Sequence, residues 1–508
     1  MTDGRKASGT RPEHPDAVVL RELAEWLAER VPALRTSGDL SVPVTGISLS
    51  SQRIQPGDLY AALPGTQAHG VDYLADARAA GAVAVLTDPD GAESISDLPA
   101  LVVDRPREVL GGLAARVYGA PATGMRLIGV TGTQGKTTTT RMAETGLSGA
   151  GIVSAVVGTV GTRVAGVDLE TSLTTPEAPD LHGLFARMRE VGVRACAMEV
   201  SSHALVMGRV DGVVFDVAVF TNLGRDHLDF HRDIDDYFAA KAGLFTPERA
   251  RLGLVNLDDA WGRKLLGLAT IPMRTFSITG DADWQATDLD LGPDGSRFRV
   301  HAPDGTSYDA ALPLPGDFNV ANALAAIAAC GEAGFDPAAV IDGIRNGPGV
   351  PGRLERIDAG QEFAVIVDYA HKPDAIESAL TTLRPLTRGR LVVVLGAGGD
   401  RDAGKRPLMG EIAARLADVL IVTDDNPRSE DPAAIRAAVL AGAAGPGRTE
   451  EIGDRAEAIR SAIARAEPGD VVLVAGKGHE TGQLVAGEVL PFDDREHARA
   501  ALAEVSGP

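Results

Sequence analysis

The stretch Leu127-Ile-Gly-Val-Thr-Gly-Thr-Gln-Gly-Lys-Thr-Thr-Thr-Thr140 decides the fold. Its first four residues form an apolar run that is typical of a buried parallel strand. A glycine- and threonine-rich loop follows, and then a helical pattern begins. In a strand–loop–helix unit of this kind, backbone N–H groups and the helix N-terminus face bound phosphate groups. The stretch therefore predicts an α/β domain that binds the phosphates of a nucleotide.

Lys136 and Thr137 carry the side chains of this loop that are expected to act on ATP and its metal. The Lys136 ammonium would offset charge on the β- and γ-phosphates of ATP, and the Thr137 hydroxyl would ligate Mg²⁺. The predicted ATP-phosphate residues are Gly132, Thr133, Gln134, Gly135, Lys136, Thr137 and Thr138. Val130 stands where the strict Gly-x4-Gly-Lys spacing has its first glycine. The alternative, a plain turn with an incidental lysine, is disfavoured because strand, loop, Lys-Thr-Thr and helix coincide.

The same alternation of apolar strands and helical patterns covers most of the chain. Strands are expected at 195–200, 215–223, 252–256, 274–278, 364–369, 391–395, 419–423 and 471–475, with a β-hairpin in 290–315 and helices at 319–331, 410–417 and 432–443. Clusters of Gly and Pro near 118–121 and 347–352 suggest domain joints. We predict a disordered tail at 1–16 and three α/β domains at 17–122, 123–351 and 352–508.

Composition limits the possible partners. The 508 residues include 49 basic and 70 acidic side chains, a net charge of −21, which repels nucleic acid and anionic membrane surfaces. Cys196 and Cys330 each lie in an apolar stretch, which favours buried thiols in a reducing compartment. The N-terminus has no signal-peptide pattern, and no apolar run reaches the length of a membrane span. We expect a cytoplasmic monomer that binds small molecules, without a nucleic-acid partner.

Two more polar segments follow apolar strands, at Met198-Glu-Val-Ser-Ser-His203 and Thr221-Asn-Leu-Gly-Arg-Asp-His-Leu-Asp229. Ligands of open α/β sheets bind at the carboxyl ends of the strands. Glu199 and His227 would each complete a magnesium shell, although His is an unusual ligand for so hard a cation. Either residue alone is more often a hydrogen-bonded structural group. Beside a phosphate loop, a metal-binding role is favoured.

These segments together resemble the Mur ligase family. The resemblance is carried by Gly132-Thr-Gln-Gly-Lys-Thr-Thr138, Glu199-Val-Ser-Ser-His203, Asn222 with Asp226-His-Leu-Asp229, and Phe318-Asn-Val-Ala-Asn-Ala323. It extends from about Ser41 to Asp494. The family consists of ATP-dependent peptide synthetases that build the peptidoglycan stem peptide, and folylpolyglutamate synthetase belongs to it too. The resemblance implies a small N-terminal UDP-binding domain, a central P-loop ATPase-like domain with a mostly parallel sheet, and a C-terminal Rossmann-like domain.

The resemblance also implies roles for single residues in catalysis and ATP binding. Lys241, in Tyr237-Phe-Ala-Ala-Lys-Ala-Gly-Leu-Phe245, matches a lysine that is carbamylated in the family, where the carbamate helps to hold Mg²⁺. From the residues alone, a solvated surface lysine would have been favoured. The implied catalytic residues are Lys136, Glu199, His203, His227 and Lys241. The implied metal ligands are Thr137, Glu199, His227 and carbamylated Lys241. Asn319, Asn322, Arg353 and Asp368 are the implied remaining contacts to ATP.

For the nucleotide-sugar peptide, the resemblance implies contacts from Ser51, Thr174, Thr175, Ser201 and Arg209. The chain departs from the family pattern at four places. Gln134 stands where Asn is common, Ser50-Ser-Gln52 replaces Asp-Ser-Arg, Met207-Gly208 replaces a frequent Gln-His, and Lys372 stands where Thr is often found. These departures concern single contacts rather than the reaction.

The choice of amino acid depends on Asp425-Asn-Pro-Arg428. An arginine at this position suits the far carboxylate of meso-diaminopimelate through paired hydrogen bonds, which lysine as a substrate has no group to accept. In the family, this motif accompanies addition of meso-diaminopimelate to UDP-N-acetylmuramoyl-L-alanyl-D-glutamate through an acyl phosphate. The implied contacts to diaminopimelate are Arg401, Asp425, Asn426, Pro427, Arg428, Gly476 and Glu480. Read alone, Asn-Pro-Arg would be a loop turn after a strand.

Three alternatives remain at this point. The first is another amide ligase, which adds lysine or extends folylpolyglutamate, although Arg428 argues against lysine. A P-loop regulator that hydrolyses ATP would leave Arg401, Asn426 and Arg428 without a role. A non-catalytic module that binds nucleotide sugars would not need Lys136, Glu199 and His227 together.

Overall fold

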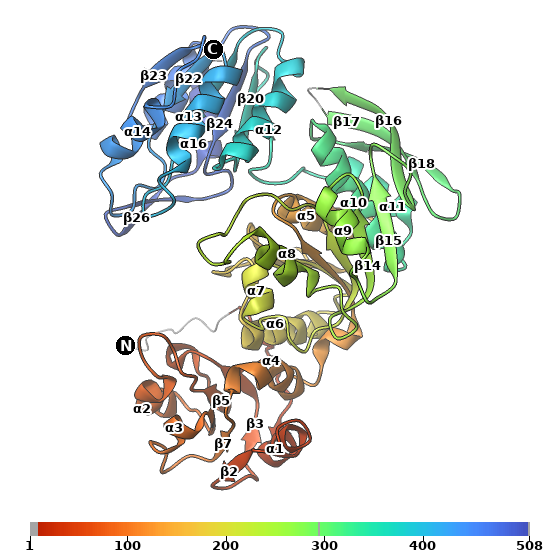
Figure 1. The fold of residues 1–508 in the computed structure, drawn as a ribbon, viewed down its shortest axis with the longest axis vertical. Helices are drawn as coiled ribbons and strands as arrows, with labels where there is room; N and C mark the ends of the chain where they lie inside the picture. Colours follow the sequence, from red (N-terminus) through yellow and green to blue (C-terminus); the bar gives the residue numbers. More distant parts are fainter. Residues whose placement is uncertain (1–8, 293–294, 506–508) are drawn as a thin grey trace. The chain divides into compact units, whose positions relative to one another are not determined.

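The computed structural model describes residues 9–292 and 295–505 (Figure 1). The chain forms two compact units. The first contains the chain up to Thr287 with Val300–Tyr308 and Ala321–Ile344, and the second contains Asp288–Arg299, Asp309–Val320 and the chain from Arg345. In the described residues, no helix is both long and apolar enough to traverse a lipid bilayer.

The N-terminal sheet has five strands in the order β2-β7-β6-β5-β4, all parallel except β2. Its strands are β2 (Arg35–Ser37), β4 (Gly46–Ser48), β5 (Asp58–Ala61), β6 (Ala84–Thr87) and β7 (Ala100–Val102). The neighbouring helices are α1 (Leu20–Ala28), α2 (Leu74–Ala79), α3 (Pro89–Ala92) and α4 (Pro106–Val117), and β1 (Val18–Val19) pairs with β3 (Pro43–Val44). The apolar faces of α1 and α4 pack on Ile47, Leu59 and Leu101 of the strands.

Residues 9–16 differ from the expected disordered tail, of which residues 1–8 lie outside the described residues. Thr10 and Arg11 are buried. The Arg11 guanidinium donates to both carboxylate oxygens of Asp58, at 2.7 and 2.8 Å, and to the carbonyl of Ile47 at 3.1 Å. The expectation was wrong here because composition does not reveal a buried carboxylate 47 residues away.

The central sheet has eleven strands in the order β11-β10-β9-β12-β8-β13-β14-β15-β16-β17-β18. Its first strands are β8 (Arg126–Thr131), β9 (Ser154–Gly158), β10 (Gly161–Val164), β11 (Val167–Leu169), β12 (Ala195–Glu199), β13 (Phe215–Phe220), β14 (Ala250–Asn256) and β15 (Met273–Ser277). The helices between them are α5 (Lys136–Gly149), α6 (Ala178–Glu190), α7 (Ser202–Val206), α8 (Ile234–Ala242) and α9 (Ala260–Leu266). The run from β9 to β15 is parallel, as buried apolar strands predict.

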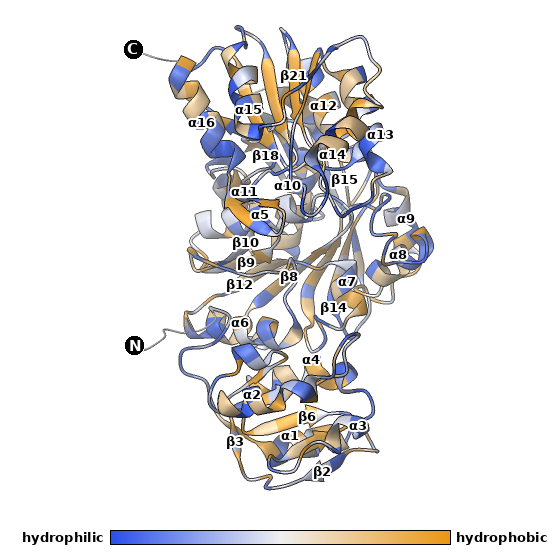
Figure 2. Ribbon diagram, turned by 90° about the vertical axis from the view of Figure 1, so that its left-hand side faces the viewer, coloured by the Kyte–Doolittle hydropathy of each residue, from blue (hydrophilic) through white to orange (hydrophobic). Residues whose placement is uncertain are grey.

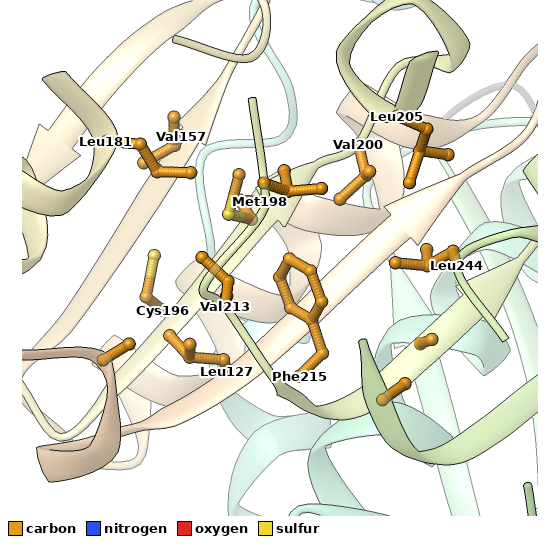
Figure 3. Close-up of a cluster of buried hydrophobic side chains, with 14 of the residues drawn as sticks. Leu127, Val157, Leu181, Cys196, Met198, Val200, Leu205, Val213, Phe215 and Leu244 are labelled. Carbon is orange, nitrogen blue, oxygen red and sulfur yellow. The ribbon is translucent and has the colours of Figure 1, made fainter. Parts of the chain in front are cut away.

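The core of this sheet is a cluster of strand and helix side chains (Figure 3). Leu127 of β8, Cys196 and Met198 of β12 and Phe215 of β13 lie within it, and Leu181 of α6 packs on the same face. Gly129 faces the Phe215 ring, where an added Cβ would approach ring carbons to 2.8 Å. Close packing at β8 therefore requires a glycine in the strand that leads to the phosphate loop.

The expected hairpin in 290–315 is part of a three-stranded excursion. It contains β16 (Trp284–Gly292), β17 (Gly295–His301) and β18 (Ser307–Leu312), so the first strand begins earlier than the turn signals suggested. The helices α10 (Asp317–Glu332) and α11 (Pro337–Arg345) follow, and α10 contains the helix expected at 319–331.

The C-terminal sheet has six strands in the order β19-β20-β24-β21-β22-β23, parallel except for β19. Its strands are β19 (Glu355–Ile357), β20 (Ala364–Asp368), β21 (Leu391–Leu395), β22 (Val419–Val422), β23 (Arg448–Glu451) and β24 (Val471–Ala475). Its helices are α12 (Pro373–Leu383), α13 (Lys405–Leu416), α14 (Pro432–Leu440), α15 (Arg455–Ala464) and α16 (Asp494–Val505); β25 (Gly482–Val485) and β26 (Glu488–Pro491) form a separate hairpin.

Both faces of the C-terminal sheet are covered, which explains its uniformly apolar strands; β21 is plainly hydrophobic in Figure 2. In β21, Leu391, Val393 and Leu395 pack on the side of α12, α13 and α14, whereas Val392 and Val394 pack on the side of α15 and α16. The observed β21 and β24 coincide with the strands expected at 391–395 and 471–475.

The buried Arg11–Asp58 pair yields a stability prediction. Arg11→Met leaves the Asp58 carboxylate in the interior without its cation, which costs about 3 kcal/mol. We expect faster amide hydrogen exchange in β4 and β5 and a lower urea midpoint. Arg30→Met, which removes the exposed partner of Glu29, is the matched control and should leave both measurements unchanged. Equal exchange in the two variants would contradict a stabilising role for residues 9–16.

Candidate functional site

The carboxyl ends of three adjacent parallel strands form the candidate site in the first compact unit. β8 lies between β12 and β13, with Glu199 of β12 paired to Val130 and Phe220 of β13 paired to Thr131. The phosphate loop, the Glu199 carboxylate and the segment from Thr221 therefore leave the sheet at one edge. Thr131 and Thr221 are 90 residues apart in the sequence, and the three motifs are neighbours because of this register.

Two glycines allow the phosphate loop to turn. Gly132 has a φ of +151° and Gly135 has a φ of +84°, both rarely accessible to residues with a Cβ. A Cβ on Gly132 would lie 1.9 Å from the Thr221 hydroxyl, and one on Gly135 would lie 2.4 Å from Asn322 Oδ1. The loop backbone thus packs directly on neighbouring side chains before α5 begins at Lys136.

The segment after β13 holds this loop in place. The backbone N–H of Gln134 donates to Asn222 Oδ1 at 2.9 Å, and the Gln134 carbonyl accepts from the Thr221 hydroxyl at 2.6 Å and from Asn222 Nδ2 at 3.2 Å. The Thr133 hydroxyl accepts from the Gly224 N–H at 3.0 Å. Fixing the N–H and the carbonyl of Gln134, which belong to two successive peptide groups, preorganises the loop backbone for an anionic ligand.

Two lysines direct their ammonium groups to one carbonyl. Lys136 Nζ and Lys241 Nζ each donate to the Gly132 carbonyl at 2.8 Å, and Lys136 Nζ also donates to the Thr133 carbonyl at 3.1 Å. Lys241, in α8, is 1% exposed and lies 4.5 Å from the centre of the Tyr237 ring. The lysine that sequence alone suggested to be on the surface is therefore buried at the phosphate loop.

Glu199 is a buried carboxylate beside the first turn of α5. Its Oε1 accepts from the Thr137 hydroxyl and from the Thr159 N–H, both at 2.8 Å, and its Oε2 accepts from the Thr159 hydroxyl at 3.2 Å. A carboxylate and a hydroxyl next to a phosphate loop are hard oxygen donors that suit Mg²⁺, which takes few protein ligands and completes its shell with phosphate and water. In the described part of the chain, no group of three or more His, Cys, Asp or Glu residues could hold a metal by itself.

His203 and His227 lie together at the rim of this edge. Their ring centres are 4.8 Å apart, and Phe230 stacks on His203 with a centre-to-centre distance of 4.0 Å. Burial, and then repulsion from His231, lowers the pKa of His203, which favours its neutral form at neutral pH. His227 has a φ of +53°, a strained conformation for a residue other than glycine. The neighbouring helices α7 and α8 lie side by side (Figure 1).

Four of the expected nucleotide-sugar residues come together around Glu199. The Thr175 hydroxyl donates to the Glu199 carbonyl at 2.8 Å and accepts from the Ser201 N–H at 3.2 Å. Thr174 shares a 3.0 Å hydroxyl contact with Thr159. Arg209 NH1 donates to the Thr175 carbonyl at 3.4 Å, and its Nε lies 2.8 Å from Glu177. The fifth, Ser51, begins a short 3₁₀ helix after β4 of the N-terminal sheet.

The two asparagines expected to contact ATP are both in α10. Asn322 Oδ1 accepts from the Thr139 hydroxyl at 3.4 Å, and it is the atom nearest to the Cβ position of Gly135. Asn319, in the first turn, is 1% exposed and donates from Nδ2 to the Pro315 carbonyl at 2.8 Å.

In the second compact unit, Arg353 precedes β19 and Asp368 ends β20, and the pairing of Glu355 with Val367 brings these two positions to the same end of the sheet. The Arg353 guanidinium lies 4.5 Å from the centre of the Tyr369 ring. The Asp368 carboxylate accepts from the N–H groups of Leu354 and Ala370 at 2.7 and 2.8 Å. Burial raises the pKa of Asp368, against the lowering effect of these N–H groups and Arg353.

The residues expected to bind diaminopimelate surround the carboxyl ends of β21, β22 and β24. Asn426 Nδ2 donates to Glu480 Oε2 at 2.9 Å, and Arg428 NH1 donates to the Gly399 carbonyl at 2.5 Å. Arg428 has a φ of +54°, and its backbone bonds to the β25 strand at Leu484. Gly476 has a φ of +124° and leaves no room for a Cβ beside Asp425, whose carboxylate would be 2.7 Å away. Arg401 is exposed in the loop after β21, and Pro427 continues the loop after β22.

Sequence reasoning missed several residues that hold these groups. Thr159 bonds the Glu199 carboxylate, Thr221 and Asn222 hold Gln134, and Lys477 bonds Asn426 and Glu480. Asn222 follows a predicted strand in a quoted motif, so its position was a usable signal. Thr159 had none, because Glu199 is 40 residues away, and Lys477 is close in sequence to Glu480 but 51 residues from Asn426, so its second contact had no local signal.

The comparisons with known proteins agree with this geometry. Three family models match: residues 43–118 the Mur ligase family, catalytic domain; residues 130–330 the Mur ligase middle domain; and residues 352–478 the Mur ligase, glutamate ligase domain. The chain is 54% identical over 506 residues to the UDP-N-acetylmuramoyl-L-alanyl-D-glutamate--2,6-diaminopimelate ligase of Streptomyces coelicolor, covering 98% of this chain and 99% of that protein.

A second relative and a solved structure carry the same enzyme name. The chain is 50% identical to the UDP-N-acetylmuramoyl-L-alanyl-D-glutamate--2,6-diaminopimelate ligase of Corynebacterium glutamicum, covering 94% of this chain and 95% of that protein. A solved structure with the same enzyme name aligns with a TM-score of 0.70 at 34% identity, covering 97% of this chain and all of that chain. The predicted three-domain α/β fold is confirmed by these matches.

Proposed function

The chain belongs to the Mur ligase family, and from this premise we propose that it is an ATP-dependent ligase that adds meso-diaminopimelate to UDP-N-acetylmuramoyl-L-alanyl-D-glutamate. Relatives at 54% and 50% identity carry the corresponding enzyme name over nearly their whole length. The observation that carries the proposal is the convergence of the two lysines on the Gly132 carbonyl beside the Glu199 carboxylate. The reaction serves the synthesis of peptidoglycan precursors.

The first step activates a carboxylate, which is a poor electrophile. An oxygen of the D-glutamate side-chain carboxylate attacks the γ-phosphorus of ATP, the bond from that phosphorus to the bridging oxygen breaks, and ADP leaves. The Lys136 ammonium offsets charge on the transferring phosphoryl group, and the first turn of α5, which begins at Lys136, supplies N–H donors. We assign His203, which lies beside His227 at the rim, to stabilise the developing charge of the acyl phosphate.

In the second step, the amine of meso-diaminopimelate attacks the acyl carbon. The bond from that carbon to the phosphate oxygen breaks, inorganic phosphate leaves, and the amine loses a proton as the amide forms. The residues proposed to bind this substrate are Arg401, Asp425, Asn426, Pro427, Arg428, Gly476 and Glu480. The proposed contacts to the nucleotide-sugar peptide are Ser51, Thr174, Thr175, Ser201 and Arg209, and those to ATP include Asn319, Asn322, Arg353 and Asp368.

We propose Mg²⁺ as the metal, held by Thr137 and Glu199 with His227 and a carbamylated Lys241. The Thr137 hydroxyl and the Glu199 carboxylate fit a hard cation. Magnesium, when bound, would supply positive charge that stabilises the phosphoryl group during its transfer. Carbamylation would convert the buried ammonium of Lys241 into an anion. We also place the enzyme in the cytoplasm, which supplies ATP and keeps buried thiols such as Cys196 reduced.

The product identifies the reaction directly. Incubation of the protein with ATP, the UDP-dipeptide and meso-diaminopimelate should give the mass of the UDP-tripeptide, together with ADP. Lys136→Ala should lower turnover by at least about a hundredfold, because charge on the γ-phosphoryl group is then uncompensated. ATP hydrolysis in the absence of any amino acid, with no tripeptide in its presence, would instead indicate a regulatory ATPase.

Arg428 yields a prediction about the choice of amino acid. Arg428→Lys should raise the KM for meso-diaminopimelate by at least about tenfold, because a single ammonium does not reproduce the paired hydrogen bonds of a guanidinium. The KM for ATP should stay unchanged. Parallel assays of wild type with meso-diaminopimelate and L-lysine provide the comparison. Equal use of the two amino acids by wild type would favour the lysine-adding alternative.

Carbamylation of Lys241 is separately measurable. In carbon-13 NMR, wild type equilibrated with labelled bicarbonate should show a carbamate signal that is lost in Lys241→Arg, because a guanidinium does not form a stable carbamate. Lys264→Arg, on the exposed face of α9, is the control and should retain the signal. A signal that persists in Lys241→Arg would remove Lys241 from the proposed metal ligands.

A further inference from the structure

Lys477 is a fully buried lysine in the loop after β24. Its side chain is 0% exposed, and its Nζ donates to Asn426 Oδ1 at 3.0 Å and to Glu480 Oε2 at 3.1 Å. Asp425 Oδ1 lies 3.8 Å away. Lysine is seldom buried completely, because the loss of hydration must be offset by charged or hydrogen-bonding partners. Here the partners are residues of the proposed amino-acid pocket.

The ammonium determines how the Asn426 amide is oriented. Asn426 Oδ1 accepts from Lys477 Nζ and from the Leu484 N–H at 2.9 Å, so the oxygen side of the amide is occupied by two donors. Asn426 Nδ2 therefore points to Glu480 Oε2, to which it donates at 2.9 Å. Without the ammonium, the loop after β22 and the Glu480 carboxylate would lose their common donor.

Tyr369, which follows β20, lies close to the Glu480 carboxylate, and burial, together with the charge of Glu480, raises the pKa of Tyr369 to about 12. Two side-chain donors from two loops converge on this carboxylate: Lys477 Nζ at 3.1 Å and Asn426 Nδ2 at 2.9 Å. Of these, Lys477 is the one that also bonds a second residue of the proposed pocket.

We propose that Lys477 is a positioning residue of the amino-acid pocket: its buried ammonium fixes Asn426 and Glu480 relative to each other. The inference rests on the proposed function, in which these two residues contact meso-diaminopimelate. Lys477 itself acts through them. Its removal therefore weakens binding of the amino acid and leaves the phosphate site, which belongs to the first compact unit, unchanged.

Arg455, at the start of α15, is another buried cation of the second compact unit, and its contacts indicate a purely structural role. Arg455 and Asp494 are both 0% exposed and form a pair with contacts of 2.7 Å. Arg455 also donates to the backbone carbonyls of Asp424 at 3.4 Å and Ala475 at 3.0 Å. Arg455 thus connects α15 to α16, to the end of β24 and to the loop after β22, whereas Lys477 bonds side chains of the proposed pocket.

The test compares Lys477→Met with wild type in steady-state kinetics. We expect the KM for meso-diaminopimelate to rise by at least about tenfold, a loss of about 1.4 kcal/mol in binding, while the KM values for ATP and the UDP-dipeptide change by less than about twofold. Arg390→Met is the matched control. It removes a cation from Asp470 at the opposite ends of the strands, and should lower the melting temperature without changing any KM.

A lower melting temperature of Lys477→Met with an unchanged KM for the amino acid would overturn the inference, because Lys477 would then resemble Arg390. If the Met variant does not fold, Lys477→Gln takes its place, since its amide N–H₂ retains one donor for Asn426 or Glu480. The same selective rise in KM is expected, and its absence again overturns the inference.

The product formed by wild type distinguishes failure of the proposed function from failure of the inference about Lys477. If wild type makes product with another amino acid, the proposed substrate is wrong, and the KM for that amino acid becomes the readout for Lys477. If wild type makes tripeptide but Lys477→Met and Lys477→Gln bind meso-diaminopimelate normally, only the inference fails. If wild type joins no amino acid at all, both are wrong.

Discussion

The parallel register of β12, β8 and β13 is the constraint on which the phosphate site depends. It places the Glu199 carboxylate, the loop from Gly132 to Thr138 and the amide of Asn222 at one sheet edge. Each contribution comes from a different strand, so none of the three short motifs makes a site alone. A shift of register by one residue would turn Glu199 to the other face and remove the carboxylate from Thr137.

Positive charge is concentrated at the phosphate loop although the net charge of the chain is negative. The chain carries a net charge of −21, yet Lys136 and Lys241 direct two ammonium groups to the Gly132 carbonyl. Lys241 is buried, which is costly for a cation unless an anion or strong dipole is close. The proposed carbamylation of Lys241 would remove that cost, while the Lys136 ammonium keeps a local positive charge for the phosphates against the net charge of the chain.

Sequence patterns predicted what depends on local order. Uniformly apolar runs identified β21 and β24 to the residue, and the strand–loop–helix unit at Leu127–Thr140 identified the phosphate loop. The patterns failed where a partner lies far along the chain. From the sequence, Arg11 belongs to a polar tail and Lys241 is a surface lysine. In the structure, Arg11 is paired with Asp58, and α8 packs Lys241 against the phosphate loop. Burial of a charge is a tertiary property, and composition does not encode it.

The C-terminal loops extend the same reasoning to the second unit. The Asp-Asn-Pro-Arg motif is visible in the sequence, but its geometry comes from residues outside it. Arg428 adopts a positive φ while its backbone bonds to β25, and the Asn426 amide is oriented by Lys477 and the Leu484 N–H. A motif names the groups that can touch a ligand, whereas neighbours contributed by other strands set their direction. Substitution of such a neighbour changes the pocket while every residue of the motif is still present.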